Sequence, residues 1–305
     1  FPNVPASIKC EDVDYVVVVD QIGDPKRIAS KEARFTQDPR ELMMAERAAD
    51  IIAALPYFTD GFSFQTGAGG PSLAVNRFLE SHMREKGIKM GFALGGVTGA
   101  ICNLMDKGLV GKILDTQDFD LTAIKHLEEN PNHVEMSQSE YANPGSKGAY
   151  VNYLDYMVLS ALEIDTKFNV NVITGSDGVV RGAPGGHPDT AASSKCCIIV
   201  TPLVRGRMAT VCKDVTTVTT PGECVDVLVT DYGTAVNPAR QDIIECLDAA
   251  GIPHVSIESL QEKAYSIVGD PDPLEWEDRV VAIVEARDGT ILDVIRQIKP
   301  YSFDR

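Results

Sequence analysis

The sequence predicts an α/β fold in which helices cover both faces of an open, mostly parallel β-sheet. Two observations indicate this: short β-branched runs alternate with amphipathic helical patterns, and Gly-rich turns come directly after several of these runs. With 305 residues, of which 44% are hydrophobic and 24% charged, the chain can bury a large core. Since no internal repeat or low-complexity tract divides it, we expect a single domain over residues 1–305.

Six apolar runs are typical of buried strands, and two further runs are typical of a closing hairpin. The six strand candidates are Tyr15–Asp20, Lys89–Leu94, Lys112–Asp115, Asn169–Thr174, Cys196–Thr201 and Asp226–Thr230. The hairpin is expected from Val280–Ala286 and Ile291–Ile298.

Two helices are predicted from their starts. The pair Asp38–Pro39 combines an N-cap residue with a first-turn proline, and the pair Asn237–Pro238 repeats this pattern. Gly251 is expected to end the second of these helices. Two more helices, Ser72–Lys86 and Ala100–Lys107, are expected after Gly-rich turns.

The charge and the cysteine content exclude several classes of protein. A formal net charge of −16 repels nucleic acid and anionic membranes, so neither is an expected partner. No apolar run approaches the ~18 residues of a membrane span. The seven Cys include no CxxC pair, which favours reduced thiols in a cytoplasmic protein and predicts no metal site. The lack of an initiator Met predicts that the chain is a piece of a longer polypeptide.

Three Gly-rich segments are the candidate functional loops: Gln65–Pro71, Gly95–Gly99 and Gly175–Asp189. Glycines let a backbone approach a ligand closely, and the free N–H groups of a helix start attract an anion. All three follow predicted strands, so we expect them at the carboxyl edge of the sheet, where open α/β folds bind ligands. The alternative is that they are tight turns. The turn-rich stretch 130–150 predicts a further functional loop.

An anionic ligand would need a local basic patch in so acidic a chain. Arg205 and Arg207, with Lys195 and Lys213 near them in sequence, are the best candidates, because guanidinium groups bind carboxylates and phosphates through paired hydrogen bonds. A solvated loop is the alternative interpretation. Among the histidines only His187 lies in a Gly-rich segment, and the others are expected to be surface or cap residues.

Three longer motifs resemble the citrate lyase alpha subunit family: Phe168–Asp189 (FNVNVITGSDGVVRGAPGGHPD), Thr201–Arg207 (TPLVRGR) and Val229–Arg240 (VTDYGTAVNPAR). The resemblance implies a CoA-transferase-like fold of the NagB/RpiA type and makes the chain the C-terminal half of a two-half subunit. It implies transfer of a carrier thioester from acetate to citrate within an oligomeric complex. The implied partners are a beta (lyase) subunit and a gamma (acyl carrier) subunit that bears a CoA-like prosthetic group. No cofactor bound covalently to this chain is expected.

One departure from the wider CoA-transferases bears on the mechanism. Many relatives place a nucleophilic Glu after the strand that corresponds to Lys89–Leu94, whereas Gly95–Gly99 reads GGVTG here. The comparison therefore favours a reaction without a glutamyl-enzyme, in which a citrate carboxylate attacks the acetyl thioester to form a mixed anhydride. Orientation and electrostatic stabilisation would then be the work of the site.

The roles inferred from the resemblance divide the candidate residues into three sets. The catalytic set is Gly95, Gly96, Thr98, Asp177 and His187. The set for the carrier or CoA arm is Gly67, Gly69, Gly70, Gly185, Gly186 and Asp189. The set for citrate or phosphate groups is Arg181, Arg205 and Arg207.

Two other functions stay open. An ordinary CoA-transferase or acyl-CoA hydrolase would act on free CoA. A non-catalytic half would only bind the carrier or assemble the complex, since sites in this fold often lie between two halves. Citramalate also stays open as the substrate in place of citrate.

Overall fold

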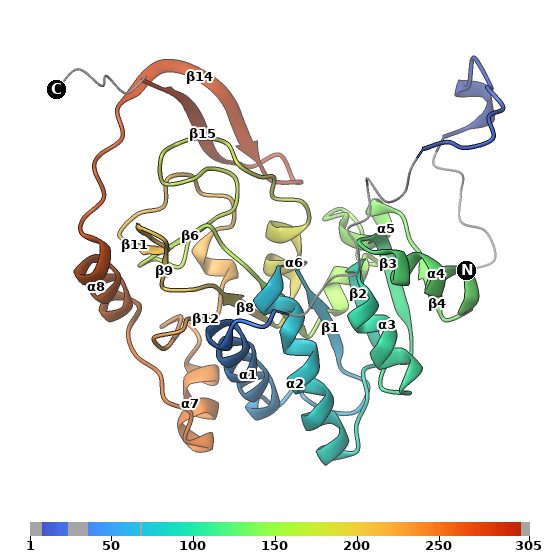
Figure 1. The fold of residues 1–305 in the computed structure, drawn as a ribbon, viewed down its shortest axis with the longest axis horizontal. Coiled ribbons are helices and arrows are strands. Elements are labelled where there is room, and N and C mark those ends of the chain that lie inside the picture. The colour runs from blue at the N-terminus through green and yellow to red at the C-terminus, as the bar shows by residue number, and fades with distance from the viewer. Residues whose placement is uncertain (1–7, 24–35, 68, 300–305) are drawn as a thin grey trace.

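The computed structural model describes residues 8–23, 36–67 and 69–299, and it confirms the predicted fold class. One eight-stranded sheet runs through its centre in the order β13-β12-β8-β5-β1-β2-β3-β4 (Figure 1). Neighbouring strands are parallel except for β12 and β13, which are antiparallel. The strands are β1 (Ser63–Thr66), β2 (Phe92–Val97), β3 (Ile113–Asp118), β4 (His133–Glu135), β5 (Tyr156–Leu159), β8 (Cys196–Val200), β12 (Val227–Val229) and β13 (Thr234–Val236).

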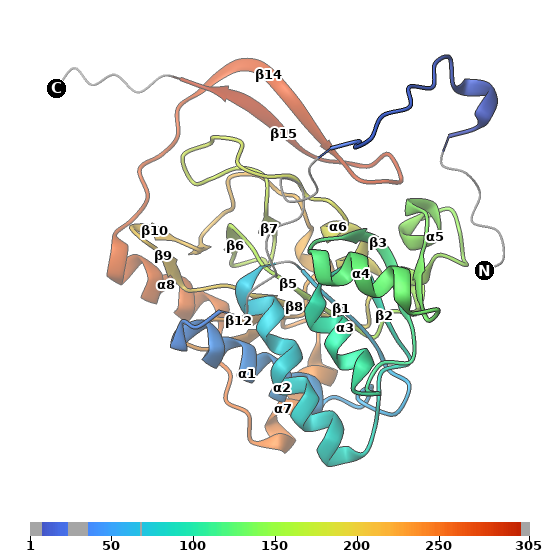
Figure 2. The same ribbon diagram turned by 45° about the vertical axis from the view of Figure 1, so that its right-hand side comes forward.

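Helices cover both faces of this sheet (Figures 1 and 2). One face carries α1 (Pro39–Ala54), α2 (Gly70–Lys86), α3 (Gly99–Asp106) and α7 (Gln241–Ala250). The other face carries α5 (Gln138–Ala142), α6 (His187–Ser193), α8 (Ile257–Val268) and a small sheet of β6 (Glu163–Asp165), β7 (Val170–Asn171) and β11 (Val211–Cys212).

Shorter elements complete the described chain. They are α4 (Leu121–Glu129) beside α3, the hairpins β9 (Val204–Arg205) with β10 (Met208–Ala209) and β14 (Trp276–Glu285) with β15 (Ile291–Ile298), and the 3₁₀ turns η1 (Cys10–Asp12), η3 (Tyr150–Tyr153) and η4 (Gly222–Cys224). The hairpin β14–β15 lies above the carboxyl edge of the central sheet and is the predicted closing hairpin (Figure 2). Among the described residues, no helix has the length and apolar character that a membrane crossing requires.

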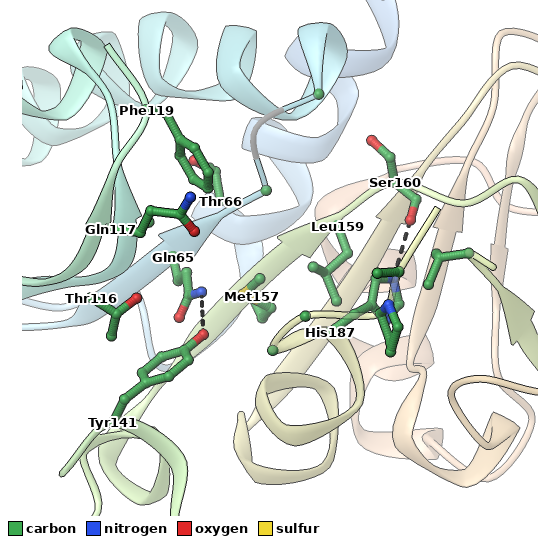
Figure 3. Close-up of a pocket in the computed structure, with 18 of the residues that line it drawn as sticks. Gln65, Thr66, Thr116, Gln117, Phe119, Tyr141, Met157, Leu159, Ser160 and His187 are labelled. Carbon is green, nitrogen blue, oxygen red and sulfur yellow. Dashed lines mark hydrogen bonds between the residues drawn. The ribbon is translucent and has the colours of Figure 1, made fainter. Parts of the chain in front are cut away.

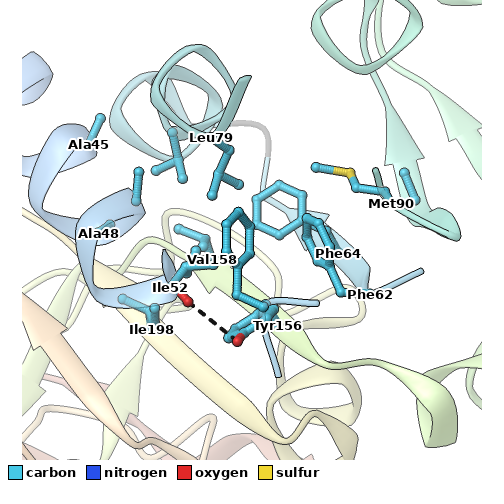
Figure 4. Close-up of a cluster of buried hydrophobic side chains, with 14 of the residues drawn as sticks. Ala45, Ala48, Ile52, Phe62, Phe64, Leu79, Met90, Tyr156, Val158 and Ile198 are labelled. Carbon is cyan, nitrogen blue, oxygen red and sulfur yellow. Dashed lines mark hydrogen bonds between the residues drawn. The ribbon is translucent and has the colours of Figure 1, made fainter. Parts of the chain in front are cut away.

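The core follows the two-residue period of the strands. In β8, Cys196 and Ile198 face the helices α1 and α2, whereas Cys197 and Ile199 face the opposite layer, and all four are fully buried. Figure 4 shows Ile52 of α1 in the first of these layers, where its backbone carbonyl accepts a hydrogen bond from the Tyr156 hydroxyl at 3.4 Å. The adjacent cysteines are therefore core residues on two faces of one strand.

Most predicted elements are confirmed with small changes at their ends. Asp38 caps α1, where its side chain accepts a hydrogen bond from the Arg40 backbone at 2.9 Å. The helix expected at Asn237–Pro238 begins later, at Gln241. The Asn237 side-chain oxygen accepts from the Ala239 backbone N–H in a turn before the helix, and its amide nitrogen donates to the carbonyls of Gly222 and Val225. Residues 130–150 contain β4 and α5 and so are not one long loop.

Two predicted strands are wrong in whole or in part. Tyr15–Asp20 forms no strand, and the Val16 and Val18 side chains are 83% and 92% exposed. β-branched residues favour an extended backbone, but a strand also needs a partner for its N–H and C=O groups, and the described part of the chain pairs none with it. Asn169–Thr174 shortens to the two residues of β7 because the Asn171 side-chain oxygen accepts from the backbone N–H groups of Ile173 and Thr174 and so ends the strand.

We expect Ile198→Ala to lower the free energy of unfolding by about 2–5 kcal/mol, because it leaves a cavity in the middle of the buried sheet. Ile283→Ala is the matched control, since Ile283 also lies on a strand but is 55% exposed, and a change within about 0.5 kcal/mol is expected there. Denaturant titration followed by circular dichroism measures both. Equal losses for the two variants would contradict the assignment of the core.

Candidate active site

The strand order of the central sheet reverses at β1. The chain first builds β2, β3 and β4 on one side of β1 and then β5, β8 and β12 on the other, so the connections leave in opposite directions at the carboxyl ends of β1 and its neighbours. Open α/β sheets bind ligands at such a point. A cavity of about 670 Å³ lies there.

The cavity is lined by the carboxyl ends of four strands and by segments from α5 and α6 (Figure 3). The cavity is also lined by the turn of the hairpin β14–β15. Its lining residues are Gln65, Thr66, Gly67, Gly69, Gly96, Thr116, Gln117, Phe119, Gln138, Tyr141, Met157, Leu159, Ser160, Val172, Ala183, Pro184, Gly185, Gly186, His187 and Arg287. None of these described lining residues is Asp or Glu, and Arg287 is the one Lys or Arg among them.

A glycine pair shapes the wall that β2 contributes. Gly95 has a φ of +99°, and the pairing of β2 with β3 shifts by one residue between Gly95 and Gly96. A Cβ at Gly95 would overlap the Gln65 amide, and one at Gly96 would overlap the Phe119 ring. The lack of a Cβ at both positions therefore leaves room for these two side chains, which line the cavity, and this close approach is the physical reason for the GG sequence.

Gln65 and Tyr141 form a buried polar pair at the cavity wall. The Gln65 amide nitrogen donates to the Tyr141 hydroxyl oxygen at 2.7 Å, and the other polar amide atom, Oε1, has no hydrogen-bond partner among the described residues. Burial raises the pKa of Tyr141 to about 12, so its hydroxyl keeps its proton at neutral pH. An unpartnered buried acceptor costs stability, which makes it a candidate ligand contact. The pair thus offers both an acceptor and a proton donor.

His187 begins α6, and both of its ring nitrogens are engaged. Its Nε2 lies 3.1 Å from the Ser160 carbonyl, which can only accept, so Nε2 carries the proton and Nδ1 accepts from the Thr220 hydroxyl at 2.7 Å. Burial lowers the pKa of His187 to about 4, which keeps the ring neutral. This arrangement suits a residue that holds the Ser160 turn in place.

Arg287 reaches the cavity from the turn of the hairpin β14–β15. Its Nε donates to Asp189 Oδ2 of α6 at 2.7 Å, and its Nη1 lies 3.4 Å from the Gln138 carbonyl. Burial raises the pKa of Asp189, while Arg287 opposes this rise. Gln65 and Tyr141 lie in two of the predicted functional segments, Gln65–Pro71 and 130–150, but neither side chain was assigned a role from the sequence. Arg287 was not expected at all, because about 100 residues separate it from the nearest Gly-rich segment.

The predicted site residues are only partly brought together. Those that line the cavity are Gly67, Gly69, Gly96, Gly185, Gly186 and His187. Those outside its lining are Gly70, Gly95, Thr98, Asp177, Asp189, Arg181, Arg205 and Arg207. Gly95 and Asp189 still act on the cavity, because they contact Gln65 and Arg287.

The arginines expected to make a basic patch lie elsewhere. Arg181 forms an ion pair with Asp177 across the turn that follows β7, and that turn packs on the hairpin β14–β15 at Gly178. Arg205 donates to the Ala161 carbonyl, and Arg207 is exposed. The third Gly-rich segment also follows the small sheet and not the central one, so only its end, at 183–187, reaches the cavity.

A second polar cluster lies between β3, β4 and α4. Nδ1 atoms of His126 and His133 are 2.9 Å apart, and His133 Nε2 lies 3.2 Å from Asp115 Oδ2. The Asn130 amide donates to His126 Nε2 at 3.2 Å. Cys102 lies within ligand distance of both rings, so a metal ion could fit geometrically. A chain of hydrogen bonds that ends at Asp115 engages both rings without one, and burial lowers the pKa of His126.

The family model described as citrate lyase, alpha subunit (CitF) matches residues 1–298. The chain belongs to the citrate lyase alpha subunit family. It is 56% identical over 299 residues to the citrate lyase alpha chain of Klebsiella pneumoniae, a match that covers 98% of this chain and 59% of that one. The chain thus spans about three-fifths of the length of that relative.

Two solved structures are similar to this chain in fold. One is described as an alpha subunit of citrate lyase from Streptococcus mutans in complex with citrate, with a TM-score of 0.93 and 53% identity over 98% of this chain and 59% of that one. The other is the alpha subunit of a malonate decarboxylase from Acinetobacter baumannii, with a TM-score of 0.58 and 17% identity over 86% of this chain and 56% of that one. The second likeness concerns the fold alone.

We expect stability to fall between pH 6.5 and about pH 4 because the folded state cannot protonate His187, whereas the unfolded state can. Because the pKa of His187 is lowered in the folded state, the stability that neutral His187 contributes is fully present above pH 6.5 and is lost as the pH falls toward 4. Denaturant titrations at pH 7 and pH 5 on wild type and His187→Gln test this. The variant should lose less stability on acidification than wild type, and an identical loss would contradict the assignment.

Proposed function

We propose that this chain carries out the acyl-carrier transfer of citrate lyase, in which acetyl-carrier and citrate give citryl-carrier and acetate. The observation that carries the proposal is the cavity at the carboxyl edge of β1, in a chain of this family. The Streptococcus mutans relative, which matches 98% of this chain, is described as a complex with citrate. The reaction is proposed for the whole subunit. We take residues 1–305 to be a single domain that forms the C-terminal half of that subunit.

The proposed reaction proceeds through a mixed anhydride. A citrate carboxylate oxygen attacks the acetyl thioester carbonyl, the C–S bond breaks, and the carrier thiolate leaves. The thiolate then attacks the citryl carbonyl of the anhydride, and acetate leaves with the bridging oxygen. The absence of Asp and Glu from the described lining residues supports this route over one through a glutamyl-enzyme.

Charge that develops on the attacked carbonyl oxygen needs a hydrogen-bond donor. Two backbone N–H groups of the Gly-rich turns are already used, since Gly67 donates to the Val158 carbonyl and Gly99 donates to Asp120. The Tyr141 hydroxyl accepts from Gln65, so its own proton is not used in that hydrogen bond and is available to another acceptor. We assign Tyr141 as an oxyanion donor beside Gly95 and Gly96, with Thr98 and Asp177 in supporting positions and His187 as a positioning residue.

The glycines of the opposite wall suit the passage of a long, thin prosthetic arm. Gly69 lies against the Ser160 side chain, and a Cβ at Gly186 would stand 2.8 Å from the Tyr141 hydroxyl. Side chains at these positions would narrow the cavity. In the proposed complex the arm belongs to the gamma subunit, the beta subunit cleaves the citryl group, and the assembly is cytoplasmic.

The alternative of a transferase or hydrolase acting on free CoA predicts exchange without the carrier. A non-catalytic binding half predicts carrier capture without acetate release. The polar groups gathered in the cavity, with an unpartnered Gln65 oxygen and a protonated Tyr141, favour a reacting site over a passive docking surface. Citramalate would fit the same scheme with one carboxylate fewer.

A single turnover with citrate labelled by ¹⁸O in its carboxylates tests the route. In the mixed-anhydride reaction the bridging oxygen comes from citrate, so we expect one ¹⁸O in the acetate that is released. Mass spectrometry of acetate from the natural polypeptide and acetyl-carrier gives the readout. Unlabelled acetate in the first turnover would instead indicate a glutamyl-enzyme, whose own oxygen leaves with acetate. Wild type that releases no acetate with intact acetyl-carrier would overturn the transferase proposal.

We expect Tyr141→Phe to lower kcat by about 10²-fold while the KM for citrate changes little, because the lost proton donor acts on the transition state. Steady-state acetate release measures both constants. Tyr153→Phe is the matched control, since Tyr153 is 59% exposed and lines no described part of the cavity. A loss in kcat that is equal in the two variants would rule out this role for Tyr141.

A further inference from the structure

The cavity described above must compensate the negative charge of citrate if it is to bind this substrate. Citrate carries three carboxylates, and the chain has a formal net charge of −16. Moving such an anion out of water requires a compensating positive charge or a dense set of donors. Among the described lining residues, Arg287 is the one Lys or Arg, and His187 is held neutral. Any direct ion pair that these described lining residues make to the substrate must therefore come from Arg287.

The hairpin that carries Arg287 is anchored to the rest of the molecule at several points. Val284 and Ile295 pack against Ile173 in a small apolar cluster, and the Asp293 carboxylate accepts from the Val218 backbone at 2.7 Å. The turn itself is tight, with a hydrogen bond from the Ala286 N–H to the Thr290 carbonyl at 2.8 Å. Arg287 consequently starts from a defined position above the carboxyl edge of the sheet.

Asp189 fixes the guanidinium itself. Its carboxylate is largely buried, with the side chain 14% exposed, and it accepts from Nε of Arg287 at 2.7 Å. The Gln138 carbonyl lies 3.4 Å from Nη1. A guanidinium has five N–H donors, and these two contacts leave the others available for a carboxylate in paired geometry. The guanidinium is thus already ordered before a ligand binds.

Arg287 and Asp189 also lie within electrostatic reach of the proposed oxyanion donor. Arg287 lowers and Asp189 raises the pKa of the Tyr141 hydroxyl, although burial has the larger effect on it. A substrate carboxylate bound at Arg287 would therefore lie in the same cavity as Tyr141.

We propose that Arg287, at the turn of the hairpin β14–β15, binds a non-reacting carboxylate of citrate, and that Asp189 positions its guanidinium for that contact. This inference rests on the proposed function and names the residue that selects a polycarboxylate there. Arg287 is a binding residue that touches the substrate, whereas Asp189 acts through it. The hairpin is thereby part of the active site and not only a closing element of the fold.

The test measures citrate binding by calorimetry without carrier, and then acetate release with carrier, in the natural polypeptide. We expect Arg287→Ala to raise the Kd and the KM for citrate by about 10- to 100-fold, with kcat changed less than about threefold. Arg287→Lys should recover part of the affinity, because it restores the charge but not the paired geometry. Arg279→Ala is the matched control: it lies on the same hairpin, bonds Gln297 and lines no described part of the cavity.

Two comparisons separate binding from folding. Asp189→Asn should weaken citrate binding in the wild type and have no further effect in the Arg287→Ala background, as expected for a positioning residue. Citramalate, with two carboxylates, should lose less affinity than citrate on Arg287→Ala if the missing group is the one bound there. If Arg287→Ala does not fold by thermal melting, the Arg287→Lys series carries the same comparisons.

The outcomes for the two proposals differ. Citrate binding that is unchanged in Arg287→Ala and Arg287→Lys, or reduced equally in Arg279→Ala, overturns the role of Arg287. Citrate binding that depends on Arg287 without acetate release from intact acetyl-carrier supports the carboxylate site and overturns the transferase function.

Discussion

Burial of both faces of the central sheet is the constraint on which the rest of this structure depends. Strands such as β8 bury alternate residues in two different layers, so neither face is left to bind a ligand. The open positions are the strand ends, and parallel strands present all their carboxyl ends at one edge. The reversal of strand order at β1 separates the connections at that edge and leaves the cavity between them.

The site is built by small departures from a regular sheet. The register shift between Gly95 and Gly96 interrupts the β2–β3 ladder, and the Gln65 amide and the Phe119 ring occupy the space that a Cβ at these glycines would need. Gln65 keeps one amide atom without a protein partner in a buried setting. Each feature lowers the stability of the fold relative to a regular strand. Such features occur at sites where a ligand can bond the unpaired polar groups.

The positive charge of the site comes from a remote part of the chain. The hairpin β14–β15 adds little to the main core, since most of its side chains are exposed, yet its turn brings Arg287 against Asp189 of α6. The ion pair links the end of the chain to the third Gly-rich segment. An acidic protein can hold an anion in this way, because one ordered guanidinium in a partly buried site acts more strongly than several solvated ones.

The sequence by itself determined the fold class, about half of the described strands and helices, and the glycines of the cavity, because periodicity, capping residues and Gly-rich turns are local signals. It also carried the family, through motifs such as Val229–Arg240. It misjudged Tyr15–Asp20, whose residues suit a strand but find no partner strand in the described part of the chain. It also grouped Arg205 and Arg207 through nearness in sequence, and neither lines the cavity. Only the tertiary structure decided that Arg287, Tyr141 and Gln65 share one cavity, because contacts between residues so far apart along the chain depend on how the sheet, the helices and the hairpin pack.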